Sequence, residues 1–70
     1  MIRLFGSDVC EPCKQVRRLL TKFGVEHEYI DVSRTDYTGE IPYLELEDGT
    51  IIMGLPNIAQ YLRSIRRQQY

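Results

Sequence analysis

The chain has 70 residues, of which 43% are hydrophobic and 27% charged, a balance typical of one soluble globular domain. No apolar run approaches the roughly 18 residues of a membrane span, and the apolar stretch 1–5 is too short for a secretory signal. The net charge of −1 gives no reason to expect nucleic acid as the main partner. We therefore expect one cytoplasmic domain over residues 1–70 that binds neither membranes nor nucleic acid.

The charges are unevenly distributed along the chain. Residues 25–50 hold eight of the ten acidic residues and a single base, whereas residues 1–24 and 51–70 are each net basic. This pattern is typical of solvated helix and strand faces.

Residues 2–5 are predicted to form a short strand, which ends at the turn-like cluster 6–8. Residues 10–23 are predicted to form a helix, because the apolar residues recur at i, i+3, i+4 and i+7: Val16, Leu19, Leu20 and Phe23. Pro12 suits the first turn of this helix and Gly24 suits its C-cap. Residues 27–32 are rich in strand formers and predict a second strand. A strand, a helix and a strand with short links predict parallel strands joined by a right-handed crossover.

The second half of the chain predicts two strands and a helix. Residues 33–40 lack an apolar period and predict a loop, with room for one helical turn. Strands are predicted at 43–46 and 50–53, and Asp48-Gly49 between them predicts an antiparallel two-residue hairpin. Residues 54–57 break the strand and open a helix whose apolar positions are Ile58, Leu62 and Ile65.

These elements predict an α/β fold of the order β-α-β-β-β-α with a four-stranded mixed sheet. The two helices would cover one face of the sheet each, or both would cover the same face.

The strongest chemical signal is Cys10-Glu11-Pro12-Cys13, at the predicted start of a helix. A bridge between residues three apart stabilises a fold least, so a structural role explains the pair poorly. The backbone N–H groups and dipole of a helix N-terminus favour a thiolate and lower its pKa. We therefore predict Cys10, at the tip, as the nucleophile and the more buried Cys13 as the resolving thiol. A four-ligand zinc site lacks ligands, since His27 is the only other soft candidate.

Nearby charges are expected to modulate the Cys10 thiolate. Asp8 and Glu11 place negative charge near it and oppose the helix dipole, whereas Lys14 and Arg17 act in the opposite direction. We expect the pKa of Cys10 to be lowered, but less than a neutral residue at position 11 would allow.

The residues resemble the glutaredoxin branch of the thioredoxin superfamily over essentially the whole chain. The resemblance rests on 5–13, on Ile41-Pro42 and on 54–57. It implies a thioredoxin-like fold in which the helix between the second and third strands is shortened or missing, at 33–40. It also implies a cis peptide bond before Pro42, a redox-active disulfide between Cys10 and Cys13, and a glutathione- or substrate-binding set made of Glu11, Pro12, Ile41, Pro42, Leu55 and Asn57.

The chain also departs from the glutaredoxin pattern. Glu11 and Pro12 replace the usual Pro and aromatic residue, Ser7 replaces a lysine, and Pro56 and Asn57 stand where the family has two acids. The run Leu-Pro-Asn-Ile-Ala-x-Tyr-Leu, at 55–62, is also similar to the N-terminal domain of glutathione transferases, which shares the fold. That enzyme class needs a second, helical domain.

The resemblance and the cysteine pair together predict a monomeric dithiol oxidoreductase that reduces protein disulfides or glutathione mixed disulfides. Ribonucleotide reductase is one protein substrate that family analogy suggests. Glutathione, or an enzyme like thioredoxin reductase, would supply the electrons, and no cofactor or metal would be tightly bound. One alternative is an iron–sulfur carrier in which two chains each contribute Cys10 and glutathione completes the ligands. Another is a non-catalytic adaptor that has kept the fold.

Overall fold

A computed structural model describes residues 1–67 as a four-stranded sheet with two α-helices. The order along the chain is β1 (Ile2–Gly6), α1 (Glu11–Lys22), β2 (His27–Asp31), a 3₁₀ turn η1 (Val32–Arg34), β3 (Tyr43–Glu45), β4 (Ile51–Met53) and α2 (Leu55–Arg67). The β-α-β-β-β-α order is therefore confirmed. So is the missing middle helix, because η1 is the only helical turn between β2 and β3 in the described part of the chain.

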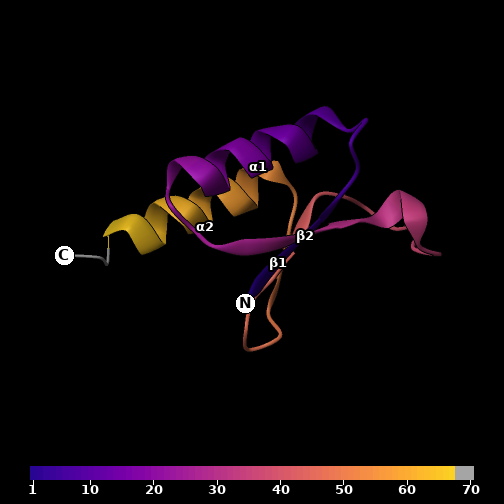
Figure 1. Cartoon of the computed structure of the whole chain (residues 1–70). Helices are drawn as coiled ribbons and strands as arrows, with labels where there is room; N and C mark the ends of the chain where they lie inside the picture. Colours follow the sequence, from indigo (N-terminus) through magenta and orange to yellow (C-terminus); the bar gives the residue numbers. More distant parts are fainter. Residues whose placement is uncertain (68–70) are drawn as a thin grey trace.

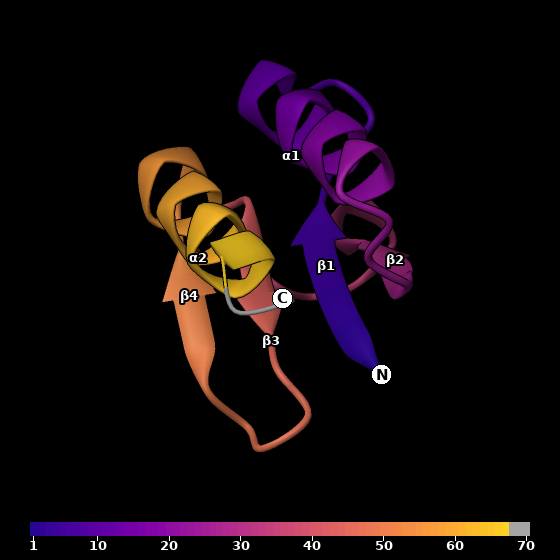
Figure 2. The ribbon, with the colours of Figure 1, turned by 90° about the vertical axis from the view of Figure 1, so that its left-hand side faces the viewer.

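The sheet is mixed, with the strand order β2-β1-β3-β4. β1 is parallel to β2 and antiparallel to β3, and β4 is antiparallel to β3. Both helices lie on the same face of the sheet, α1 over β1 and β2 and α2 over β3 and β4 (Figures 1 and 2). This arrangement decides between the two layerings that the sequence left open.

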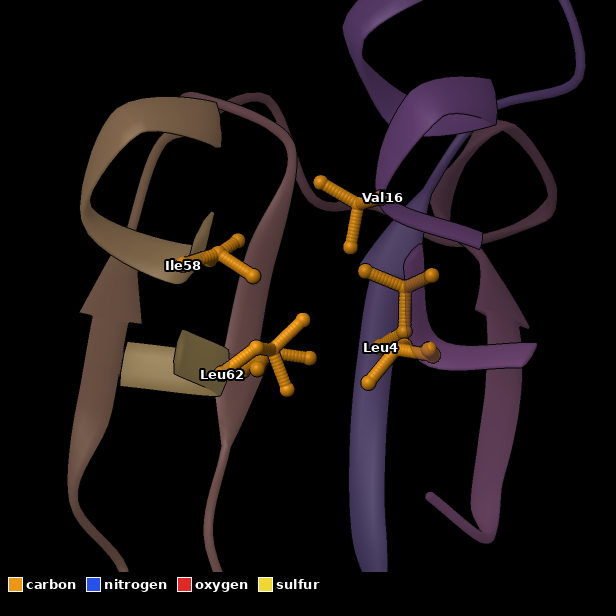
Figure 3. Packing of buried hydrophobic residues seen from close by; sticks show 6 residues of the cluster. Leu4, Val16, Ile58 and Leu62 are labelled. Carbon is orange, nitrogen blue, oxygen red and sulfur yellow. The ribbon is translucent and has the colours of Figure 1, made fainter. Parts of the chain in front are cut away.

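The core lies between the sheet and the two helices. Its six fully buried members come from four elements: Leu4, Val16, Leu20, Leu44, Ile58 and Leu62. Leu4 faces Val16 on α1 and the α2 side chains Ile58 and Leu62 (Figure 3). Burying a side chain of this size contributes about 1.5–3 kcal/mol. The predicted apolar faces of both helices are thus confirmed as the buried faces.

Helix α1 begins and ends within one residue of the predicted range 10–23. Cys10 is the N-cap residue and Pro12 lies in the first turn, where its missing N–H leaves no helix bond unmade. After the last turn, Gly24 adopts φ +69° and donates its N–H to the Thr21 carbonyl at 3.1 Å. A residue with a Cβ is strained at this φ, which explains the glycine.

Several predicted boundaries are wrong by one residue, as at the ends of β1, α1 and β3 and at the start of β4. β2 ends at Asp31 instead of Val32, because the Asp31 carboxylate accepts the Ser33 N–H and thereby caps η1. The β3–β4 connection is antiparallel as predicted but is longer than two residues. Gly49 donates its N–H to the Leu46 carbonyl at 3.0 Å and adopts φ +91°, so Asp48-Gly49 closes a turn within the three-residue loop 47–49.

Candidate functional site

Three segments distant in sequence meet at one end of the sheet. β1 leads from Gly6 into the loop that carries Cys10. Phe5 pairs with Tyr43, and Tyr43 pairs with Met53. The residues just before Tyr43 and just after Met53 therefore lie at the end of the sheet where β1 stops. The arrowheads of β1 and β4 point to this same end (Figure 2). The register thus brings residues 7–13, 41–42 and 54–57 together, as the resemblance implied.

Cys10 and Cys13 form a disulfide across the first turn of α1, with their Cα atoms 5.2 Å apart. The Cys10 Sγ also accepts the Cys13 backbone N–H at 3.3 Å and so serves as the helix cap. Cys10 is half-buried, whereas Cys13 is 0% exposed. The prediction that Cys13 is the more buried of the two is confirmed. In the reduced protein, the same N–H and the helix dipole favour a thiolate on Cys10.

Gly6 gives Cys13 the space that it occupies. A Cβ at position 6 would lie 3.0 Å from both Cβ and Sγ of Cys13, and 3.6 Å from Cε1 of Tyr29. Contacts of 3.0 Å are shorter than ordinary van der Waals packing. The last residue of β1 is therefore small because the second cysteine packs directly against its backbone.

The acids and bases expected near the cysteines are paired with one another. Lys14 Nζ lies 3.4 Å from Glu11 Oε2, and Arg17 Nη1 lies 3.7 Å from Asp8 Oδ1. All four side chains are exposed, so each pair contributes little to stability. Each carboxylate near Cys10 therefore has a neighbouring cation on α1, which offsets its negative charge at the sulfur.

Tyr29 on β2 extends this polar cluster. Its hydroxyl donates to Asp8 Oδ1 at 3.0 Å, and the Arg17 guanidinium lies 4.2 Å from its ring centroid. Burial raises the pKa of Tyr29 above its ordinary value, and the hydrogen bond to Asp8 raises it further. The neutral phenol therefore ties the loop before Cys10 to the second strand.

Ile41-Pro42 has a cis peptide bond, as the family resemblance implied. Pro42 is fully buried, and its carbonyl accepts the Gly54 N–H at 2.9 Å. This bond joins the segment before β3 to the start of α2. Within residues 1–67 no hydrogen bond occupies the backbone of Ile41, which is half-buried.

The remaining predicted ligand residues occupy helix starts. Glu11 and Pro12 are exposed in the first turn of α1, beside Cys10. Leu55 is half-buried against the core. Asn57 is exposed, and its Nδ2 donates to the Met53 carbonyl at 3.0 Å. The amide of Asn57 thus bonds to the chain just before α2.

Sequence reasoning did not assign Gly6 or Tyr29 to the site. A glycine directly before a loop that carries a Cys-x-x-Cys motif is the only local signal for the first, and nothing local marks the second. His27 begins β2, and its Nδ1 lies 2.9 Å from the Val25 carbonyl. Tyr43 stacks on Phe5 with ring centroids 4.4 Å apart.

The chain belongs to the glutaredoxin family, whose sequence pattern it matches over residues 2–47. No curated protein matches it. Among solved structures, a glutathione transferase homologue from Sulfitobacter with bound glutathione is 20% identical and superposes with a TM-score of 0.82. That match covers 97% of this chain but only 38% of the transferase.

A buckwheat glutaredoxin–glutathione complex is 18% identical, with a TM-score of 0.73 over 93% of this chain and 70% of the glutaredoxin. At such identities the two structures establish the thioredoxin-like fold.

Residues 1–67 show neither a membrane-spanning helix nor a cluster of metal ligands. Neither helix is long and apolar enough to cross a membrane. No three His, Cys, Asp or Glu side chains in this part of the chain gather in a group that could hold a metal ion.

Proposed function

We propose that the protein is a dithiol oxidoreductase that reduces protein disulfides or glutathione mixed disulfides through Cys10 and Cys13. The observation that carries the proposal is the disulfide across the first turn of α1, with a half-buried sulfur at the helix tip and a buried one behind it. Membership of the glutaredoxin family supports thiol chemistry at this pair.

The reaction proceeds by two thiol–disulfide exchanges. The Cys10 thiolate attacks one sulfur of the substrate disulfide, the substrate S–S bond breaks, and the first substrate thiolate leaves and takes up a proton. Cys13 then loses its proton and attacks Cys10 Sγ. The mixed disulfide breaks, the second substrate thiolate leaves, and the Cys10–Cys13 disulfide forms. Two electrons pass from the cysteine pair to the substrate.

Glutathione is the electron donor we favour, with an enzyme like thioredoxin reductase as the alternative. One glutathione thiolate attacks Cys10 Sγ and displaces Cys13. A second attacks the resulting mixed disulfide, which releases oxidised glutathione and the Cys10 thiolate. We propose that Ile41 offers its backbone to the tripeptide or to a substrate chain, and that Pro42, Leu55 and Asn57 complete the binding surface with Glu11 and Pro12. The reduced pair would be maintained in the cytoplasm, where thiols are kept reduced.

A glutathione redox titration tests this function. The protein is equilibrated in buffers of defined reduced-to-oxidised glutathione ratio, the thiols are trapped, and the intact mass is measured. A reversible two-electron transition supports the proposal. A glutathione adduct on Cys10 that accumulates in Cys13→Ser supports glutathione as the donor, and a clean internal disulfide without adduct favours a reductase.

Cys10→Ser serves as the matched control, since it removes the nucleophile and leaves the buried thiol in place. If the wild-type thiols never form an internal disulfide, the redox function is wrong. Colour and iron content after anaerobic purification would then identify an iron–sulfur carrier, and their absence would favour an adaptor.

A further inference from the structure

Opposite charges are separated between the helices and the rest of the molecule. α1 carries four bases and one acid, and α2 carries three bases and no acid. The strands and loops outside the two helices carry nine acids and two bases. Both helices lie on the same face of the sheet (Figure 1), so the near-zero net charge conceals two basic helices and an acidic set of strands and loops.

The bases of α1 form a continuous stripe, which we call the α1 stripe: Lys14, Arg17, Arg18 and Lys22. Their spacing of i, i+3, i+4 and i+8 places them on one face of the helix, opposite the buried residues Val16 and Leu20. All four are exposed. Lys14 and Arg17 have carboxylate partners near the disulfide. Among residues 1–67, no carboxylate lies within ion-pair distance of Arg18 or Lys22.

The α1 stripe starts beside the redox-active pair and leads away from it. Lys14 follows Cys13 directly, and Asp8 from the loop before Cys10 lies at the same end. An open depression of about 790 Å³ runs along the stripe, lined by its four cations with Asp8 and Thr21. From Lys14 to Lys22 the helix rises about 12 Å. An extended segment of about four residues has that length.

We propose that the α1 stripe binds an acidic segment of the protein whose disulfide is exchanged at Cys10. This inference rests on the proposed function. A substrate chain attached to Cys10 through its sulfur brings its flanking residues over the first turn of α1, where the stripe begins. Carboxylates there meet two cations that lack a described partner. Complementary charge of this kind raises association rates and suppresses wrong partners. A nucleic acid fits less well, since its phosphates would be repelled by the nine acids of the strands and loops.

Peptide substrates test the proposal directly. Three peptides share one intramolecular disulfide and differ in a flanking run of four Glu, four Gln or four Lys. The rate constant for oxidation of the fully reduced protein is measured with each peptide by quenching and mass analysis, at low and at high salt. We expect the Glu peptide to react fastest and the Lys peptide slowest at low salt. We expect the difference to shrink as salt screens the charges.

Charge-reversal variants then locate the effect. Arg18→Glu and Lys22→Glu are each expected to slow the Glu peptide about threefold to tenfold at low salt and to leave the Gln peptide unchanged. Arg63→Glu on α2 is the matched control, because it makes the same change in net charge at an exposed helical arginine. It is expected to leave the peptide ranking as in the wild type. A melting curve confirms that each variant is folded.

The outcomes separate this inference from the function on which it rests. Equal rates for the three peptides overturn the α1 stripe as a binding surface and leave the oxidoreductase standing. An equal loss in Arg63→Glu and Arg18→Glu overturns it as well, because the effect would then follow overall charge. No reaction with any peptide overturns the inference together with the reduction of protein disulfides, and the glutathione titration then decides whether any redox function remains.

Discussion

Replacing Gly6 by Ala is expected to destabilise the protein, although this change stabilises many proteins. Gly6 does not have the positive φ of Gly24, Gly49 or Gly54. On backbone entropy alone, Ala at such a position would gain about 0.4–1 kcal/mol. The added Cβ would however lie 3.0 Å from two atoms of Cys13, a residue that is 0% exposed.

The buried Cys13 determines whether Gly6→Ala raises or lowers the free energy of unfolding. Overpacking a core position by one methyl costs about 1–3 kcal/mol. Since Cys13 lies on the buried face of α1 and packs against Gly6 of β1, it cannot move away into solvent. After the entropy gain is subtracted, we expect a net loss of about 1–2 kcal/mol in the free energy of unfolding. For a domain of this size that loss lowers Tm by about 4–16 °C.

The assay is thermal and urea unfolding of four proteins under reducing conditions: wild type, Gly6→Ala, Cys13→Ala and the double variant. Reductant is needed because Cys13→Ala cannot form the disulfide. Removing the Cys13 sulfur relieves one of the two close contacts, so the double variant should be more stable than the sum of the single changes predicts, by about 0.5 kcal/mol or more. A Gly6→Ala protein as stable as the wild type, or strictly additive effects, would refute the reasoning.

Three further results are expected. Tyr29→Phe removes the hydrogen bond to Asp8 and should cost about 0.5–1.5 kcal/mol. Since the pKa of Tyr29 is raised from 10.0 in the folded protein, its contribution is present below pH 10.0 and lost as pH rises through the folded value, so alkaline unfolding curves should show a shallower loss in this variant. Leu44→Ala empties a fully buried position and should cost about 2–5 kcal/mol in urea unfolding. Hydrogen bonds from the Ser33 hydroxyl and N–H lower the pKa of Asp31 below 3.8. Their contribution is present above pH 3.8 and lost as pH falls through the folded value, so Ser33→Ala should reduce the loss of stability in acid.

The helices and their buried faces were predictable because their signals are local. The apolar stripes have the helical period, and Gly24 marks the end of α1 in sequence and structure alike. The length of the loop between β3 and β4 was not predictable, because Asp48-Gly49 suits both a two-residue turn and a longer loop with Gly in the left-handed position. In the structure, the hydrogen bond from the Gly49 N–H to the Leu46 carbonyl belongs to the longer loop.

Some residues of the candidate site were also predictable from the sequence, and others were not. Cys10 and Cys13 were predicted from a motif and its position before a helix, and the cis bond at Pro42 from the family resemblance. Gly6 and Tyr29 could not be placed, because their contacts depend on the pairing of β1 with β2 and on the packing of α1 over them. Side chains brought together by strand register leave no pattern in a single sequence.

The position of β1 has a consequence for the growing chain. β1 lies between β2 and β3 in the sheet. Arg3 on β1 pairs with Glu45 on β3, which lies 42 residues further along the chain. A ribosome releases β1, α1 and β2 first, so the parallel pair can form early, whereas β3 follows only at Tyr43–Glu45. During that interval β1, one of the two central strands of the finished sheet, is an edge strand with unpaired backbone groups. The emergence of three residues, Tyr43 to Glu45, therefore ends the period in which a foreign strand can join this protein at its centre.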